Sequence, residues 1–160
     1  RLYAWCFLDR PELPGHLYPA GAFTLAASEA ACVYEGSVDY LEACNMSFRT
    51  EALQAVGGFD ETFGGIGDWS EPDGAIRVRR YTGGTLWFTP KALLVHQPSA
   101  AGATVYRWQD ARQRLANYRL FARRYIKPNF RHGCYHAFLM VYYGTHLLRS
   151  CLSSPPKRIA

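Results

Sequence analysis

The charged residues divide this 160-residue chain into two parts with opposite balance. Residues 1–100 carry 7 basic and 12 acidic side chains, whereas residues 101–160 carry 11 basic side chains and only one acidic residue, Asp110. The change falls in a stretch of small residues at 98–104. We therefore predict a domain of residues 1–100, followed by a basic extension of residues 101–160. Such an extension is typical of contact with a polyanion, either nucleic acid or an anionic membrane surface.

The composition limits the class of protein. Hydrophobic residues make up 49% of the chain and charged residues 19%, which excludes a disordered chain. The five cysteines form no C-x-x-C pair, and an odd number does not suggest a disulfide framework. We therefore expect a globular protein in a reducing, cytosolic compartment. Because Arg1 leads at once into an apolar segment, we also expect the chain to be a piece of a longer protein.

The first domain alternates short apolar runs with short helical patterns, which indicates an α/β fold with helices covering a sheet. Its predicted strands are three apolar runs, at residues 2–8, 85–89 and 93–96. A helix is predicted to begin with Thr50 as its cap and to turn Leu53 and Val56 inward. It should end at Gly57 and Gly58, because glycine readily adopts the left-handed conformation that closes a helix.

The basic extension is predicted to be helical. Apolar residues recur at helical spacing as one stripe: Trp108, Ala111, Leu115, Tyr118, Ala122 and Tyr125. Lys127 and Pro128 should end this helix, and residues 132–148 then contain no charged side chain. That run is shorter than a bilayer requires, so we predict a helix lying on a membrane or packed on the domain. The aromatic stripe and the basic charge together predict a peripheral protein at the cytosolic face of an anionic membrane.

A glycine-rich acidic segment precedes another predicted helix of the first domain. Its acidic residues are Asp60, Glu61, Asp68, Glu71 and Asp73. In one interpretation, Ser70 and Asp73 form a capping box at the start of that helix. In the other, Glu71 and Asp73 lie at the mouth of a cleft, where one carboxylate accepts a proton from a hydroxyl nucleophile and the other holds the substrate.

His96 follows the last apolar run of the domain, at a point where a strand would leave the sheet. Ligands of open α/β sheets bind at such strand ends, so His96 is either a metal ligand or a structural histidine. A Mg²⁺ or Mn²⁺ ion would need further oxygen ligands from carboxylates or a diphosphate. The sequence contains no P-loop, G-x-G-x-x-G or HExxH motif. Without a recognition motif on the basic helix, nucleic-acid binding is disfavoured.

Several runs follow one another in an order found in one enzyme family. They are NMSFR (45–49), EAL (51–53), VGGFDETF (56–63), GDWSEPD (67–73), IRVRR (76–80), LWF with Pro90, and VH (95–96). Together they resemble the second half of the catalytic domain of family 2 glycosyltransferases. The resemblance implies a partial GT-A fold and the inverting transfer of a sugar from a nucleotide-diphosphate sugar to an acceptor hydroxyl.

The resemblance also implies roles for particular residues. Glu71 would be the catalytic base, and Asp73 the second acidic residue of the motif. Trp69, Asp68 and Asn45 would bind the acceptor, a glycan or a lipid-linked saccharide. His96 would bind the divalent cation, Mn²⁺ or Mg²⁺, under the diphosphate.

The sequence also departs from the family. The chain contains no D-x-D motif, which the family carries in its donor-binding first half. We therefore expect this chain to be the acceptor-side half of the domain, with the basic helical extension attached. The alternative is a non-catalytic module of the same fold that acts at a membrane surface or as a scaffold.

Overall fold

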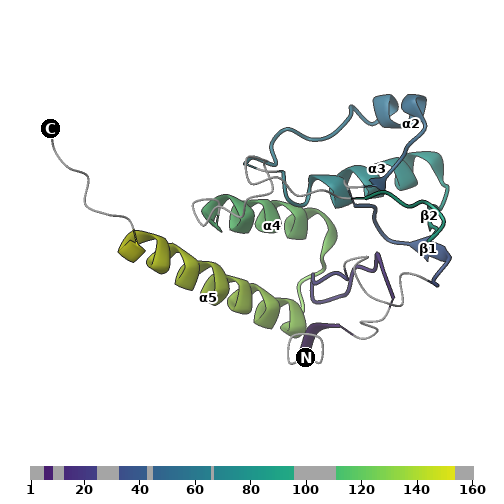
Figure 1. Ribbon diagram of the computed structural model, residues 1–160. Coiled ribbons are helices and arrows are strands. Elements are labelled where there is room, and N and C mark those ends of the chain that lie inside the picture. Colours follow the sequence, from purple (N-terminus) through teal and green to yellow (C-terminus); the bar gives the residue numbers. More distant parts are fainter. Residues whose placement is uncertain are drawn as a thin grey trace, which may run out of the picture.

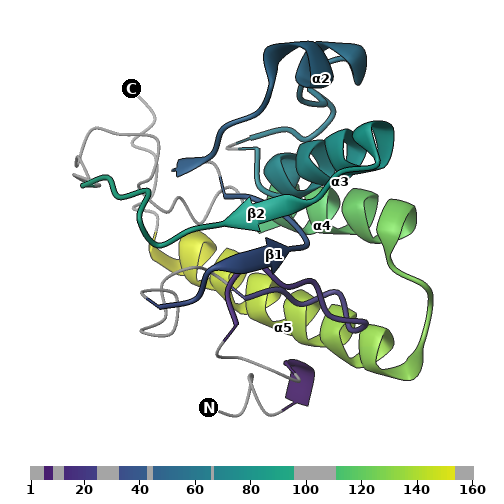
Figure 2. The same cartoon turned by 90° about the vertical axis from the view of Figure 1, so that its right-hand side faces the viewer.

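The computed structural model describes residues 6–8, 13–24, 33–42, 45–65, 67–95 and 111–153. The described elements are β1 (Gly36–Val38), α2 (Thr50–Ala55), α3 (Ser70–Thr82), β2 (Leu86–Phe88), α4 (Ala111–Tyr125) and α5 (Phe130–Ser153). The four helices follow one another across the molecule in chain order, and α5 forms its outer layer (Figures 1 and 2). The described fold is therefore mostly helical, with one small sheet.

The sheet consists of β1 and β2, which pair antiparallel with Ser37 opposite Trp87. The neighbouring pair, Val38 and Leu86, packs with Ala75 of α3 in a small core. The strand predicted at residues 85–89 is thus confirmed as β2. Its exposed residue Trp87 and buried residue Leu86 alternate, as the side chains of a half-buried strand must.

Two other strand predictions are wrong where they can be compared. Cys6 and Phe7 are helical, and the Phe7 ring packs against Tyr135 and Phe138 of α5 instead of entering a sheet. Residues 93–95 form no strand, and their apolar side chains are all exposed. An apolar run forms a buried strand only when a neighbouring strand and a covering layer are supplied, and the described residues supply neither here. His96 and residues 2–5 lie outside the described residues.

The predicted ends of α2 and α3 are only partly correct. Gly57 and Gly58 both adopt left-handed φ values directly after α2, which confirms the predicted helix end. Thr50 is the first residue of α2 rather than its cap, and the buried side chain of this helix is Ala52. The capping box at α3 is wrong. Trp69 occupies the cap position with φ 76°, and no side chain caps the helix.

The main core joins α3 to α4 and α5. Its buried members include Phe63, Trp69, Ile76, Tyr118, Phe121, Tyr135 and Leu139. The predicted stripe on α4 is confirmed at Ala111, Tyr118 and Ala122, which are buried, whereas Trp108 lies outside the described residues. The two helices of the basic extension thus complete the core of the rest of the chain. The predicted boundary near residue 100 also lies outside the described residues.

Two glycines are expected to respond to alanine with opposite signs. Gly58 has φ 72°, whereas Gly144 lies within α5, and neither has a heavy atom within 4 Å of the position of an added Cβ. Gly58→Ala should lower the free energy of unfolding by about 1–2 kcal/mol, because a left-handed conformation disfavours a side chain. Gly144→Ala should raise it by about 0.5–1 kcal/mol, because alanine favours the helix. Urea unfolding measures both, and equal signs would contradict the assigned conformations.

Candidate functional site

The acidic segment between α2 and α3 is held in place by side chains of α4. Asn117 Nδ2 donates to the Gly64 carbonyl at 2.9 Å. The Arg114 guanidinium lies 3.0 Å from the Asp68 carboxylate, and that of Arg124 lies 2.7 Å from the carboxylate of Asp60. Two arginines of the basic extension, Arg114 and Arg124, are therefore paired with carboxylates of residues 1–100. The basic helix binds the acidic segment of its own chain.

Asp73 is the centre of a buried ionic cluster. Its side chain is fully buried, and it accepts hydrogen bonds from Arg77 Nε at 2.7 Å, Arg124 Nη1 at 2.8 Å and the Tyr125 hydroxyl at 2.7 Å. Burial and the hydrogen bond to Asp73 raise the pKa of Tyr125 to about 12. Asp73 therefore supports the fold and is closed to a substrate. This placement differs from both predicted roles, the capping box and the catalytic or substrate-holding carboxylate.

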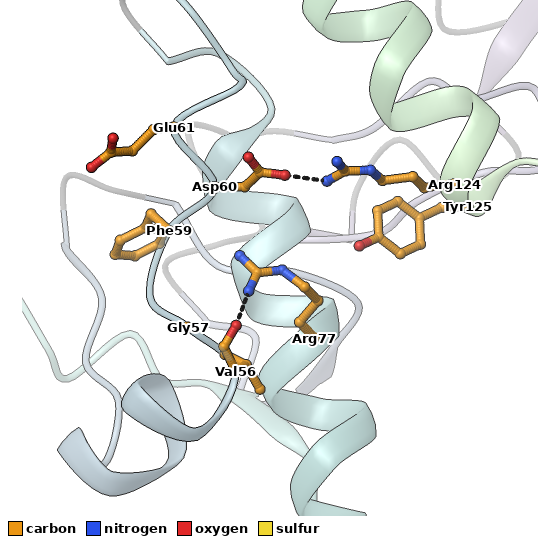
Figure 3. Close-up of a pocket in the computed structure, with 8 residues that line it drawn as sticks. All are labelled: Val56, Gly57, Phe59, Asp60, Glu61, Arg77, Arg124 and Tyr125. Carbon is orange, nitrogen blue, oxygen red and sulfur yellow. Dashed lines mark hydrogen bonds and ion pairs between the residues drawn. The ribbon is translucent and has the colours of Figure 1, made fainter.

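Arg77 extends the cluster to the end of α2. Its Nη1 and Nη2 atoms donate to the carbonyls of Val56 and Gly58 at 2.6 and 2.8 Å. Three members of the cluster, Arg77, Arg124 and Tyr125, also line a pocket of about 570 Å³ (Figure 3). It is lined by Val56, Gly57, Phe59, Asp60, Glu61, Arg77, Arg124 and Tyr125. Both arginines of this pocket are already paired with aspartates, so the pocket offers no unpaired cation to an anionic ligand.

The ionic cluster makes stability depend on acid pH. Hydrogen bonds from Thr62, and then from Arg124, lower the pKa of Asp60 from 3.8 to about 2. The contribution of Asp60 to stability is therefore present above pH 3.8 and is lost as the pH falls towards 2. We expect Asp60→Asn to be less stable than the wild type at neutral pH and to approach it in acid. Urea unfolding across this pH range tests this, and a difference independent of pH would contradict it.

Glu71 lies in the first turn of α3 in a different environment from Asp73. Its side chain is half-buried, and no Lys or Arg of the described residues forms an ion pair with it. Burial raises its pKa above 4.5, and the negative charges of Asp68 and Glu42 raise it further. A carboxylate with a raised pKa and no cationic partner is suited to accept a proton from a hydroxyl group.

The other predicted site residues are placed as follows. Asp68 is half-buried and lies close enough to Glu71 to influence its charge. Trp69 is only 8% exposed and packs in the core against Phe23, Tyr118 and Phe121, so it lines no acceptor cleft. Asn45 is exposed, and its Nδ2 donates to the carbonyl of Ala92. Glu71 and Asp68 are thus brought together, whereas His96 lies outside the described residues.

No metal-binding cluster is evident in the part of the chain that the structure describes, since it contains no group of three or more His, Cys, Asp or Glu side chains suited to a metal ion. Comparison with known proteins yields no matching family, curated protein or solved structure.

Proposed function

We propose that this chain is the acceptor-side half of an inverting glycosyltransferase. The reaction would transfer a sugar from a nucleotide-diphosphate sugar to a hydroxyl of a glycan or a lipid-linked saccharide. The observation that carries the proposal is the position of Glu71, which is half-buried in the first turn of α3 and forms no ion pair with a Lys or Arg of the described residues. Its pKa is raised by this burial and by the charges of Asp68 and Glu42. The order of sequence motifs around Glu71 supports the same reaction.

In this proposal Glu71 is the general base. Its carboxylate takes the proton of the acceptor hydroxyl while the hydroxyl oxygen attacks the anomeric carbon of the donor sugar. A new bond forms between that carbon and the acceptor oxygen, and the bond to the diphosphate breaks, so the nucleoside diphosphate leaves with its electron pair. A single displacement inverts the configuration at the anomeric carbon. Asp68 is a positioning residue, because Arg114 holds it where its charge acts on Glu71.

The donor and the cation rest on the resemblance alone. A divalent cation, Mn²⁺ or Mg²⁺, would neutralise charge on the departing diphosphate, and His96 is the residue proposed to bind it. The proposed location is the cytosolic face of a membrane, where lipid-linked acceptors are accessible.

A second candidate function is a non-catalytic module that acts as a scaffold or at a membrane surface. The absence of a D-x-D motif from all 160 residues favours it. The two candidates differ in a single outcome, which is whether a nucleoside diphosphate is released.

The test uses the complete polypeptide that contains this chain. Release of nucleoside diphosphate is measured from a panel of nucleotide sugars, with saccharide acceptors and Mn²⁺ or Mg²⁺ present. The transferase predicts acceptor-dependent release and a product of inverted anomeric configuration. Binding of a donor without any release would favour the non-catalytic module.

A further inference from the structure

We propose that one surface of the molecule, formed by α4 and α5, binds the anionic phospholipid headgroups of a membrane. We define the outer face of α5 by its exposed residues Phe130, Cys134, Ala137, Val141, Thr145 and Leu148. The arginine edge consists of the exposed residues Arg112, Arg119 and Arg123 of α4. The proposal concerns these two adjoining features and is independent of the reaction proposed for Glu71.

The outer face of α5 is apolar and lacks a protein cover among the described residues. Val141 and Leu148 are 67% and 66% exposed, and Phe130 is still more exposed. The opposite face of the same helix carries Tyr135 and Leu139, which are buried in the core. The helix therefore has one apolar face against the domain and a second one directed away from it. Figure 1 shows α5 as the outermost layer, beyond α4.

The arginine edge borders this apolar face. Arg119 Nε donates to His136 Nε2 at 3.0 Å, and Arg119 Nη2 contacts Met140 Sδ at 3.3 Å, so its guanidinium lies against α5. No carboxylate of the described residues pairs with the arginine edge. The sequence from residue 111 to residue 160 contains no Asp or Glu at all. The surface thus combines exposed apolar side chains with positive charge that no neighbouring carboxylate on α4 or α5 neutralises.

This combination matches a lipid surface better than a second copy of the chain. Apolar side chains enter the headgroup region of a bilayer, while arginines beside them attract anionic lipids. A symmetric dimer through the outer face of α5 would instead bring two arginine edges together, without any carboxylate on either helix to neutralise them. No helix of the described residues is long and apolar enough to cross a membrane. The exposed apolar side chains and the adjoining arginine edge point to a helix that lies on the membrane surface.

The surface differs from the one that the sequence pattern predicts. Tyr118 is buried, and Tyr125 binds Asp73, so these two members of the aromatic stripe are not available to lipid. The proposed lipid contact is instead made by α5, which has apolar residues on both its inner and its outer face. A variant on the outer face of α5 can therefore remove lipid binding without disturbing the core.

The test is co-sedimentation of the full 160-residue chain with vesicles. Phosphatidylcholine vesicles with added phosphatidylglycerol are compared with vesicles of phosphatidylcholine alone, at low and at high salt. The test variant combines Val141→Glu with Leu148→Glu. The matched control combines Leu93→Glu with Val95→Glu, which are also exposed, at 87% and 84%, and make the same change in charge.

We expect the wild type and the control to bind the anionic vesicles at low salt and to bind the neutral vesicles poorly. The test variant should bind at least about 10-fold more weakly than the control, because its carboxylates replace side chains that enter the headgroup region. Circular dichroism should show that all three proteins are folded.

Three results would overturn the proposal. The first is equal weakening in the test variant and the control, which would mean that net charge alone governs binding. The second is equal binding to neutral vesicles at high salt. The third is failure of the wild type to bind either vesicle. If the wild type then forms a dimer that the test variant dissociates, the outer face of α5 binds a second copy instead.

Discussion

Asp73→Ala is expected to lower the free energy of unfolding by about 3–5 kcal/mol, because it removes a fully buried carboxylate and leaves the half-buried Arg77 guanidinium without its ion-pair partner. Arg77 and Arg124 both pair with Asp73, and Tyr125 donates its hydroxyl hydrogen to it. For a chain of this length, such a loss should lower the melting temperature by roughly 10 °C. Thermal and urea unfolding of the variant measure the effect.

Asp39→Ala is the matched control for this prediction. Asp39 also pairs with an arginine, Arg79 at 3.3 Å, and accepts a hydrogen bond from the Leu17 amide at 3.0 Å. Its side chain is 37% exposed, so its loss should cost less than that of Asp73, about 1–2 kcal/mol. If Asp73→Ala cost no more than Asp39→Ala, the ionic cluster would not anchor α4 to α3.

Glu71→Gln is expected to lower turnover about 100-fold or more in the complete polypeptide, while donor binding stays almost unchanged. The fold should be equally stable or slightly more stable. Because the folded state raises the pKa of Glu71, its charged form destabilises the fold. That cost is absent below the ordinary pKa of 4.5 and fully present above the raised pKa. Loss of turnover without loss of stability would distinguish a base from a structural carboxylate.

The pH dependence of turnover tests the same role of Glu71 independently. Turnover should fall in acid as Glu71 becomes protonated, at a higher pH than for an ordinary glutamate, because burial and the charges of Asp68 and Glu42 raise its pKa. Asp68→Asn removes one of these charges and should move the acid limb of the rate profile to lower pH. An acid limb that does not move would mean that another group controls the rate.

Local patterns predicted the elements whose burial is decided within a few residues. The spacing of Ala111, Tyr118 and Ala122 predicted the inward face of α4, and consecutive glycines predicted the end of α2. The apolar run at 93–95 predicted a strand that does not form, because burial of such a run depends on partners elsewhere in the chain. The tertiary contact of Phe7 with α5 likewise outweighed the strand preference of its neighbours.

In the candidate site, too, the sequence predicted only the contacts between residues close together in the chain. Glu71 and Asp68 lie three residues apart, so the sequence itself keeps them close. The partners of Asp73 are one local residue, Arg77, and two distant ones, Arg124 and Tyr125. Arg77 follows it at the helical i, i+4 spacing, a signal visible in the sequence, whereas Arg124 comes from a helix about fifty residues later. The capping prediction considered only the neighbours of Asp73, and a buried carboxylate is governed by the strongest donors that the fold brings to it.

The most direct test of the proposed function is the turnover of Glu71→Gln relative to Glu51→Gln in the complete polypeptide. Glu51 is a suitable reference, because it also lies in the first turn of a helix, α2, and is exposed. Acceptor-dependent release of nucleoside diphosphate is measured for both variants at saturating donor, together with their melting temperatures. The proposal predicts that Glu71→Gln is about 100-fold slower than Glu51→Gln, with no lower melting temperature. Equal turnover of the two variants would contradict the assignment of Glu71 as the base.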